Sequence, residues 1–192
     1  MRYATRLGLV LGLAAASAGC SATANDGGPI ILSGYGSLQA AARMRAGAHP
    51  AIDYGGRIGD PILAAADGTV RNAFSGPLCG NGVVLEHSGF ARFTLYCHMQ
   101  ETRAGIGDTV KRGQVIGTLG ATGEPTARTP PGRNPIPQLH FELSDNPRPR
   151  NDGDLAGTYD PLKITVGCFA PGKTYPNDRL VLTHPVQCRD RS

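Results

Sequence analysis

Glycine and proline interrupt this chain so often that they leave little room for long helices. The 192 residues include 27 glycines and 15 prolines, and both residue types break helices and favour turns. Between them lie short runs in which apolar and polar residues alternate, the period of half-buried strands. With 40% hydrophobic residues, a chain of this length can bury a sizeable core. The sequence therefore predicts a turn-rich, all-β globular protein.

Strands are expected where the alternation is clearest. These segments are 83–86, 93–98, 109–110, 115–119 and 139–143. Along 93–98, alternation groups His98 with Thr94 and Tyr96 on one face. The Pro/Gly/Thr/Arg-rich segment 121–137 is a long loop of the kind that often carries function.

The first residues have the features of an export signal. A start with two arginines precedes the apolar stretch 7–16, which is too short to span a bilayer. Ser17-Ala18-Gly19-Cys20 resembles a bacterial lipobox, although leucine usually stands at position 17. We therefore expect a signal peptide at 1–19 and a tether at 20–46 with lipid on Cys20, anchored at the periplasmic face of the envelope. Ordinary cleavage after Ala16-Ser17-Ala18 is the alternative, and it would leave a periplasmic protein.

The five cysteines fit an exported protein if Cys20 carries lipid. Four cysteines then remain for an oxidising compartment, with three possible pairings. We favour Cys79–Cys97 and Cys168–Cys188, because each closes a short local loop. The chain has no Cys-x-x-Cys pair, which argues against a zinc ribbon or a thioredoxin-like site.

The charge of the chain gives no support to nucleic-acid binding. The formal net charge is +4 from 19 basic and 15 acidic residues. Removal of 1–19 takes away two arginines and leaves 17 minus 15, or +2, which is too small to predict a nucleic-acid partner.

Three residues have the chemistry of a metal site. His49 and Asp53 are four residues apart, so both can reach one cation if the chain between them turns tightly. On the strand around 139–143, His140 shares a face with Gln138 and Glu142, while Leu139, Phe141 and Leu143 would face the core. Two histidines, one carboxylate and an open fourth position make a catalytic zinc arrangement. Spacing alone does not show that His140 is the third ligand.

Five segments occur in an order that resembles the lysostaphin-like family of zinc peptidases, which cut peptide cross-links of bacterial peptidoglycan. They are HPAIDYGG, GDPILAAADGTV, NGVVLEHSGFARFTLYCHM, GDTVKRGQVIGTLGATG and QLHFEL, and they cover roughly residues 47–145. The resemblance implies a curved, open antiparallel sheet with long groove-forming loops. We expect a zinc peptidase-like β domain at 47–165, followed by a tail at 166–192 that bears the Cys168–Cys188 disulfide.

The resemblance also assigns roles to residues. It implies that His49, Asp53 and His140 hold Zn²⁺ and that His98 of the family's Tyr-x-His motif assists catalysis. No role is matched for His184. We interpret His87, which precedes Ser88-Gly89, as a surface turn residue.

Gln138 departs from the family pattern, which has a catalytic histidine at this position. Glutamine forms hydrogen bonds but cannot carry a proton near neutral pH. Two functions therefore stay open: a zinc endopeptidase acting on peptidoglycan, and a zinc-bound module that binds peptidoglycan or activates another cell-wall hydrolase. A third and weaker resemblance, of GDTVKRGQVIG to lipoyl-type hairpins, lacks the usual residues around the carrier lysine.

Overall fold

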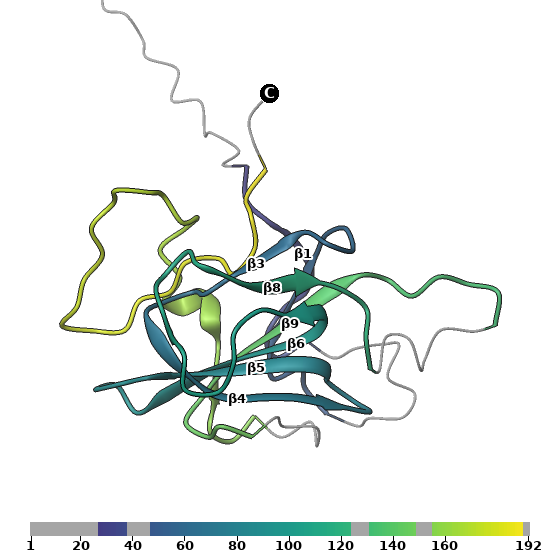
Figure 1. Cartoon of the computed structure of the whole chain (residues 1–192), viewed down its shortest axis with the longest axis horizontal. Helices are drawn as coiled ribbons and strands as arrows, with labels where there is room; N and C mark the ends of the chain where they lie inside the picture. Colours follow the sequence, from purple (N-terminus) through teal and green to yellow (C-terminus); the bar gives the residue numbers. More distant parts are fainter. Residues whose placement is uncertain (1–26, 38–46, 124–130, 149–154, 190–192) are drawn as a thin grey trace, which may run out of the picture.

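The computed structural model describes residues 27–37, 47–123, 131–148 and 155–189. Within these ranges the chain forms short strands and one turn of 3₁₀ helix, which agrees with the all-β prediction (Figure 1). The strands are β1 (Ile30–Ser33), β2 (Ile52–Gly55), β3 (Pro61–Leu63), β4 (Gly68–Gly76), β5 (Gly80–His87), β6 (Arg92–Thr102), β7 (Thr109–Val110), β8 (Val115–Leu119), β9 (Gln138–Ser144) and β10 (Thr158–Tyr159), and the helix is η1 (Pro161–Lys163).

The strands form one open antiparallel sheet. Its main path runs in the order β1-β2-β9-β6-β5-β4-β7, and β10 pairs with β9. Strand β8 pairs with the last part of β6 and also with β3. The β3–β8 pair is therefore off the main path and joins it through β6 (Figure 1). Because β9 is central, its side chains have neighbours from both β2 and β6.

One face of the central strands carries the main hydrophobic core. Leu139, Phe141 and Leu143 of β9 are buried there, as their alternation predicts. The Phe141 ring packs between Tyr96 and Tyr54, with ring centroids 5.1 and 6.2 Å away. Burial of a large apolar side chain of this kind contributes about 1.5–3 kcal/mol. This packing fixes the orientation of β9 and therefore aims the opposite face of the strand.

The opposite face carries polar residues and a second, small apolar cluster. Gln138, His140 and Glu142 of β9 lie on this face. Across the β6–β9 ladder, Cys97 is paired with His140 and Leu95 with Glu142. The small cluster consists of Cys79, Val84, Leu95 and Cys97, with Phe74 and Phe93 packed against it. We call this group the satellite cluster.

A bulge in β6 changes the face on which His98 lies. The register shifts from Val83↔Tyr96 to Asn81↔Met99, so β6 uses one residue more than β5. His98 lies in this bulge with a φ of 65°, which costs a residue with a side chain roughly 1–2 kcal/mol. Met99 takes the next core position and is fully buried. The expected grouping of His98 with Thr94 and Tyr96 is therefore wrong, because simple alternation does not continue through a bulge.

The segment expected to be a tether contributes a strand to the sheet. Strand β1 falls within 20–46, yet it pairs with β2 through Ile30↔Gly55 and Ile31↔Tyr54. The expected signal peptide at 1–19 and the proposed lipidation site Cys20 lie outside the described residues.

The C-terminal tail packs onto the domain and is closed by a disulfide between Cys168 and Cys188. Leu182 of the tail is buried in the main core, and Val186 forms a bridge with Ile62 of β3. A second disulfide joins Cys79 to Cys97. Both pairs are the ones favoured from their spacing. In the described ranges no helix is long and apolar enough to span a bilayer.

Candidate metal centre

The register of two neighbouring strands brings Asp53 and His140 together. In the β2–β9 ladder these residues are direct partners. Their side chains point to the same face, and His140 Nδ1 lies 3.0 Å from Asp53 Oδ1. Asp53 is buried, while the His140 side chain is 17% exposed. The pair is thus open on the His140 side and closed behind Asp53.

His49 reaches the same point from the loop before β2. Its backbone is tied to the turn after β1, because Gly36 N–H donates to His49 O at 2.7 Å and His49 N–H donates to Ser37 O at 3.0 Å. These bonds direct the imidazole toward Asp53, and His49 Nε2 lies 3.2 Å from Asp53 Oδ1. Edge strand β1 and its turn therefore help to build the site.

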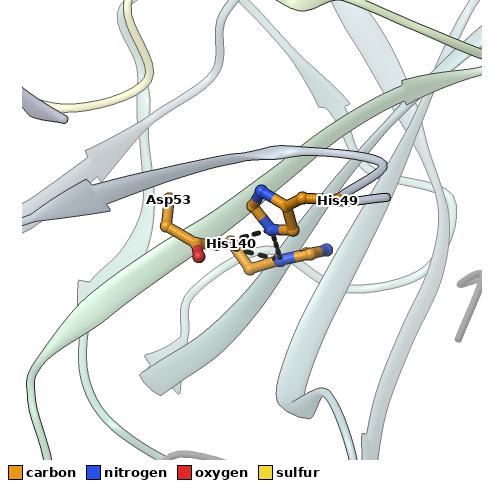
Figure 2. A group of neighbouring side chains, drawn as sticks. All are labelled: His49, Asp53 and His140. Carbon is orange, nitrogen blue, oxygen red and sulfur yellow. Dashed lines mark hydrogen bonds and ion pairs between the residues drawn. The ribbon is translucent and has the colours of Figure 1, made fainter. Parts of the chain in front are cut away.

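Three donor atoms meet at one point (Figure 2). The remaining side of the triangle, from His49 Nε2 to His140 Nδ1, is also 3.2 Å. Ligand atoms about 2.0–2.2 Å from one tetrahedral zinc ion lie roughly 3.3–3.6 Å from one another. The observed separations come within a few tenths of an ångström of that spacing. Among the described residues this is the group of His, Cys, Asp and Glu side chains able to hold a metal ion.

Hydrogen bonds on the far side of each imidazole prepare the site for a cation. His49 Nδ1 lies 3.2 Å from the carbonyl oxygen of Gly34 and 3.2 Å from Ser33 Oγ; the carbonyl can only accept, which favours a proton on Nδ1. His140 Nε2 lies 3.0 Å from Glu142 Oε1 and donates to it in the same way. With its outer nitrogen bonded in this way, each ring can present its other nitrogen, unprotonated, to a bound cation, which is the arrangement of carboxylate- or carbonyl-oriented metal ligands. Without a metal, the same two nitrogens lie within hydrogen-bond distance of Asp53 Oδ1. The donor set fits Zn²⁺.

The charges of the site support the same interpretation. Burial favours a higher pKa for Asp53, but hydrogen bonds from His140 and His49 outweigh it and hold the pKa far below its usual range. Asp53 is therefore a carboxylate. Burial favours a lower pKa for His140, but hydrogen bonds with Asp53 and Glu142 raise the pKa to about 10. Without metal, a proton on His140 balances the two carboxylates, and a divalent cation would take over that role.

His98 stands beside the three metal-site residues. Its ring centroid is 5.8 Å from that of His140, and the side chain is almost fully buried. Nδ1 donates to the backbone carbonyl of Thr122 at 2.9 Å, so Nε2 is the basic nitrogen. Burial and the neighbouring His140 lower the pKa of His98 to about 4. At neutral pH the ring is a neutral base.

Thr122 is a site residue that the sequence does not single out. Its hydroxyl donates to Met99 O at 2.9 Å and accepts from Asn81 N–H at 3.0 Å. These bonds fix the carbonyl that orients His98. The nearest signal in the sequence is the glycine on either side of Ala121-Thr122, which lets this loop approach β5 and β6 closely.

Gln138 lies on the site face of β9, two residues before His140, and is half-buried. Its backbone N–H donates to Gly120 O at 2.9 Å. Its side chain is an amide, which can form hydrogen bonds but cannot exchange protons near neutral pH.

The other two histidines lie outside the centre. His87 is buried rather than on the surface, so the expectation of a surface turn residue is wrong. The strand continues through His87, whose Nδ1 lies 2.8 Å from Asp67 O and whose Nε2 lies 2.9 Å from Thr94 Oγ1. His184 Nδ1 lies 3.2 Å from the Tyr54 hydroxyl.

An open antiparallel sheet with a His-Asp-His centre and a neutral histidine beside it defines a zinc metallopeptidase-type domain. The sequence model of Peptidase family M23 matches residues 47–152, and the chain belongs to this family. The resemblance to lysostaphin-like peptidases is therefore confirmed.

Three similar proteins support the assignment. The chain is 39% identical over 99 residues to the peptidoglycan DD-endopeptidase ShyC of Vibrio cholerae, an alignment that covers 52% of this chain but 21% of ShyC. It resembles the catalytic domain of lysostaphin from Staphylococcus simulans with a TM-score of 0.57 and 27% identity, covering 70% of this chain and 90% of that domain. It also resembles a zinc-containing peptidase from Vibrio cholerae with a TM-score of 0.50 and 31% identity, covering 62% of this chain and 36% of that one.

Proposed function

We propose that this protein is a zinc endopeptidase that hydrolyses peptide cross-links of bacterial peptidoglycan. The observation that carries the proposal is the meeting of His49 Nε2, Asp53 Oδ1 and His140 Nδ1 at 3.0–3.2 Å. The outer hydrogen bonds of both imidazoles turn their basic nitrogens toward that point. Peptidoglycan is the substrate of the related DD-endopeptidase by its name.

In this proposal His49, Asp53 and His140 hold the ion. Bound zinc would lower the pKa of a water molecule toward about 7 and polarise a carbonyl group. Glu142 keeps the His140 ring in the orientation that presents Nδ1. Asp53 supplies the negative charge of the ligand set, and its burial shields that charge from solvent.

His98 is the proposed general base. Its Nε2 is unprotonated because Thr122 O binds the Nδ1–H, and its pKa of about 4 keeps it so at neutral pH. The ring can therefore receive a proton from an attacking water and return it to the leaving amine.

Gln138 makes this a slow peptidase in our proposal. Loss of a proton-transferring group typically costs about 10²–10⁴-fold in rate. Glutamine retains hydrogen bonding at the same place, so it can still orient a water molecule or a developing oxyanion. His98 is left as the main proton carrier.

The place of action is the bacterial cell envelope. Two disulfides fit an oxidising compartment, and the sequence of residues 1–20 predicts export with lipid on Cys20. We expect the intact mass of membrane-extracted protein to include the lipid, and Cys20→Ala to release the protein from the membrane fraction. An unlipidated mature chain beginning after Ala18 would instead support ordinary signal cleavage.

The direct test is cleavage of isolated, cross-linked peptidoglycan by the purified protein. We expect new amino groups to appear, chelator to stop their release and added zinc to restore it. The variant His98→Gln should keep its zinc and lose most of the activity. Absence of amine release by zinc-loaded protein would contradict the proposal.

Gln138 also favours a second candidate, a zinc-bound module that binds peptidoglycan or activates another cell-wall hydrolase. In that case the wild type would bind zinc and sediment with peptidoglycan without releasing amines. Activity that appears only in Gln138→His would identify this second function. Activity in the wild type that increases in Gln138→His would support the endopeptidase.

A further inference from the structure

The Cys79–Cys97 disulfide lies next to both the metal centre and His98. Cys97 is the direct partner of His140 in the β6–β9 ladder and immediately precedes His98 in the chain. Both cysteines are buried in the satellite cluster. The disulfide is therefore adjacent to a metal-site residue on β9, His140, and to the proposed base, His98.

Through Cys79, the disulfide also holds the backbone of His98. The Cys79 carbonyl accepts the His98 N–H at 2.7 Å. His98 has a left-handed backbone conformation, which residues with a side chain keep only when their surroundings impose it. The disulfide links Cys79 to Cys97, and the hydrogen bond links Cys79 to His98. Together they hold the left-handed backbone of His98 in place.

The segment after Cys79 holds the ring of His98. Asn81 N–H donates to Thr122 Oγ1 at 3.0 Å. A Cβ atom at Gly80 would overlap Thr122, so the two segments are in close contact. The Thr122 carbonyl in turn accepts the His98 Nδ1–H. Movement of residues 79–81 would therefore release the ring as well as the backbone.

We propose that the Cys79–Cys97 disulfide positions His98, keeping Nδ1 on Thr122 and Nε2 available as the base. The catalytic consequence rests on the proposed function, while the effect on His98 itself does not. The protein would then need an oxidising compartment for full activity.

The second disulfide gives a matched control. Cys79 and Cys97 are 18 residues apart, and Cys168 and Cys188 are 20 apart. Loops of nearly equal length restrict the unfolded chain to nearly the same extent. The control disulfide joins two residues of the tail, outside β5 and β6. A difference between the two double variants would therefore result from the position of the disulfide in the fold and not from loop-closure entropy.

The experiment compares C79S/C97S with C168S/C188S in the full chain. Zinc content, the amide exchange and imidazole nitrogen signals of His98 by NMR, and kcat on peptidoglycan are measured for each. We expect C79S/C97S to keep its zinc, to exchange the His98 amide about tenfold faster or more, and to lose the Nδ1–H signal. Its kcat should fall about 10–100-fold. C168S/C188S should match the wild type in all of these.

Equal His98 signals in the two double variants would overturn the proposal. If C79S/C97S does not fold, the folded variant C20S/C168S/C188S is treated with a dithiol, which becomes a disulfide as Cys79 and Cys97 become thiols. Unchanged His98 signals after that reduction would also overturn it. In a protein that releases no amines from peptidoglycan, the NMR signals still decide the positioning role, so its failure is distinct from that of the proposed activity.

Discussion

Asp53 and His140 face each other across β2 and β9 as direct partners in the ladder, with His140 Nδ1 3.0 Å from Asp53 Oδ1. This relationship is set by backbone hydrogen bonds on both sides of the pair and by the core residues beneath β9. The metal centre is therefore built mainly on strands, and only His49 comes from a loop. Sites on regular elements hold their geometry more tightly than sites on loops.

Asp53→Asn should remove most of the zinc affinity while it preserves the shape of the side chain. The amide supplies no negative charge to the ligand set, whereas carboxylate oxygens are regular zinc ligands. We expect the zinc affinity to fall by more than the roughly 10–100-fold that loss of an outer-shell partner costs. Competition with a chromogenic chelator measures this. Asp60→Asn is the control, because Asp60 accepts Arg57 N–H in the loop after β2; equal zinc affinity in both variants would contradict the ligand set.

Glu142 should matter for zinc binding although it lies behind His140. One carboxylate oxygen accepts the His140 Nε2–H, and the other, Oε2, is buried with no hydrogen-bond partner among the described residues. Glu142→Ala should lower the zinc affinity about 10–100-fold. Glu142→Gln should cost less, because its amide oxygen can still accept from Nε2.

The control for Glu142 is Glu86→Ala on β5, whose carboxylate is 42% exposed and 3.8 Å from Arg71. Zinc titration of the three variants should place Glu86→Ala with the wild type. An affinity of Glu142→Ala equal to that of the wild type would show that His140 needs no partner on Nε2.

His87 should make the fold sensitive to mild acid. Burial lowers the pKa of this histidine below its usual range, and the hydrogen bond with the Asp67 carbonyl opposes that shift only in part. Because the folded-state pKa is below the unfolded value of about 6.5, the unfolded chain binds the proton more readily. The stabilisation is complete above about pH 6.5 and is lost as the pH falls through the folded-state pKa.

The measurement is urea unfolding from pH 8 to pH 5 in the presence of chelator, for the wild type and His87→Gln. The contributions of the metal-site histidines cancel in the difference between the two proteins. We expect His87→Gln to be less stable at pH 8 and to lose less stability on acidification. Parallel pH profiles would show that His87 does not titrate differently on folding.

The sequence predicts the site best where strand alternation is regular. Leu139, Phe141 and Leu143 are in the core, and His140 is on the opposite face, because β9 has no bulge before or after it. The same alternation through Val83 and Leu85 would have placed His87 in the core. The surface position expected for His87 is wrong because the predicted strand stops at Glu86, whereas β5 continues through His87.

The sequence predicts poorly what depends on distant backbone contacts. No glycine marks the bulge at His98, so the local pattern gives no sign that the face changes. Thr122 is 24 residues from His98, and their contact depends on the close approach of the 120–123 loop to Gly80. Strand β1 likewise cannot be predicted from its own residues, because it is defined by its pairing with β2.

The close approach of that loop can be tested at Gly123. Gly123 and Gly132 have almost the same backbone conformation, with φ of 76° and 77°. A Cβ atom at Gly132 has nothing within 4 Å, whereas one at Gly123 would lie 2.6 Å from Leu78 O and 2.7 Å from Gly80 Cα. Gly132→Ala should therefore cost only the left-handed strain of about 1–2 kcal/mol. Gly123→Ala adds overlap with backbone atoms that cannot turn away, so it should cost more.

Urea unfolding gives the free-energy difference between these two variants, and NMR of the His98 ring shows its local effect. We expect Gly123→Ala to move the Thr122 carbonyl and weaken the Nδ1–H signal of His98, while Gly132→Ala leaves that signal unchanged. Because the backbone atoms that a Cβ at Gly123 would meet belong to Leu78 and Gly80 and not to the three metal-site residues, zinc content should be the same in both variants. Equal stability and equal His98 signals would mean that the 120–123 loop does not hold the ring, and the orientation of His98 would then have to come from β6 alone.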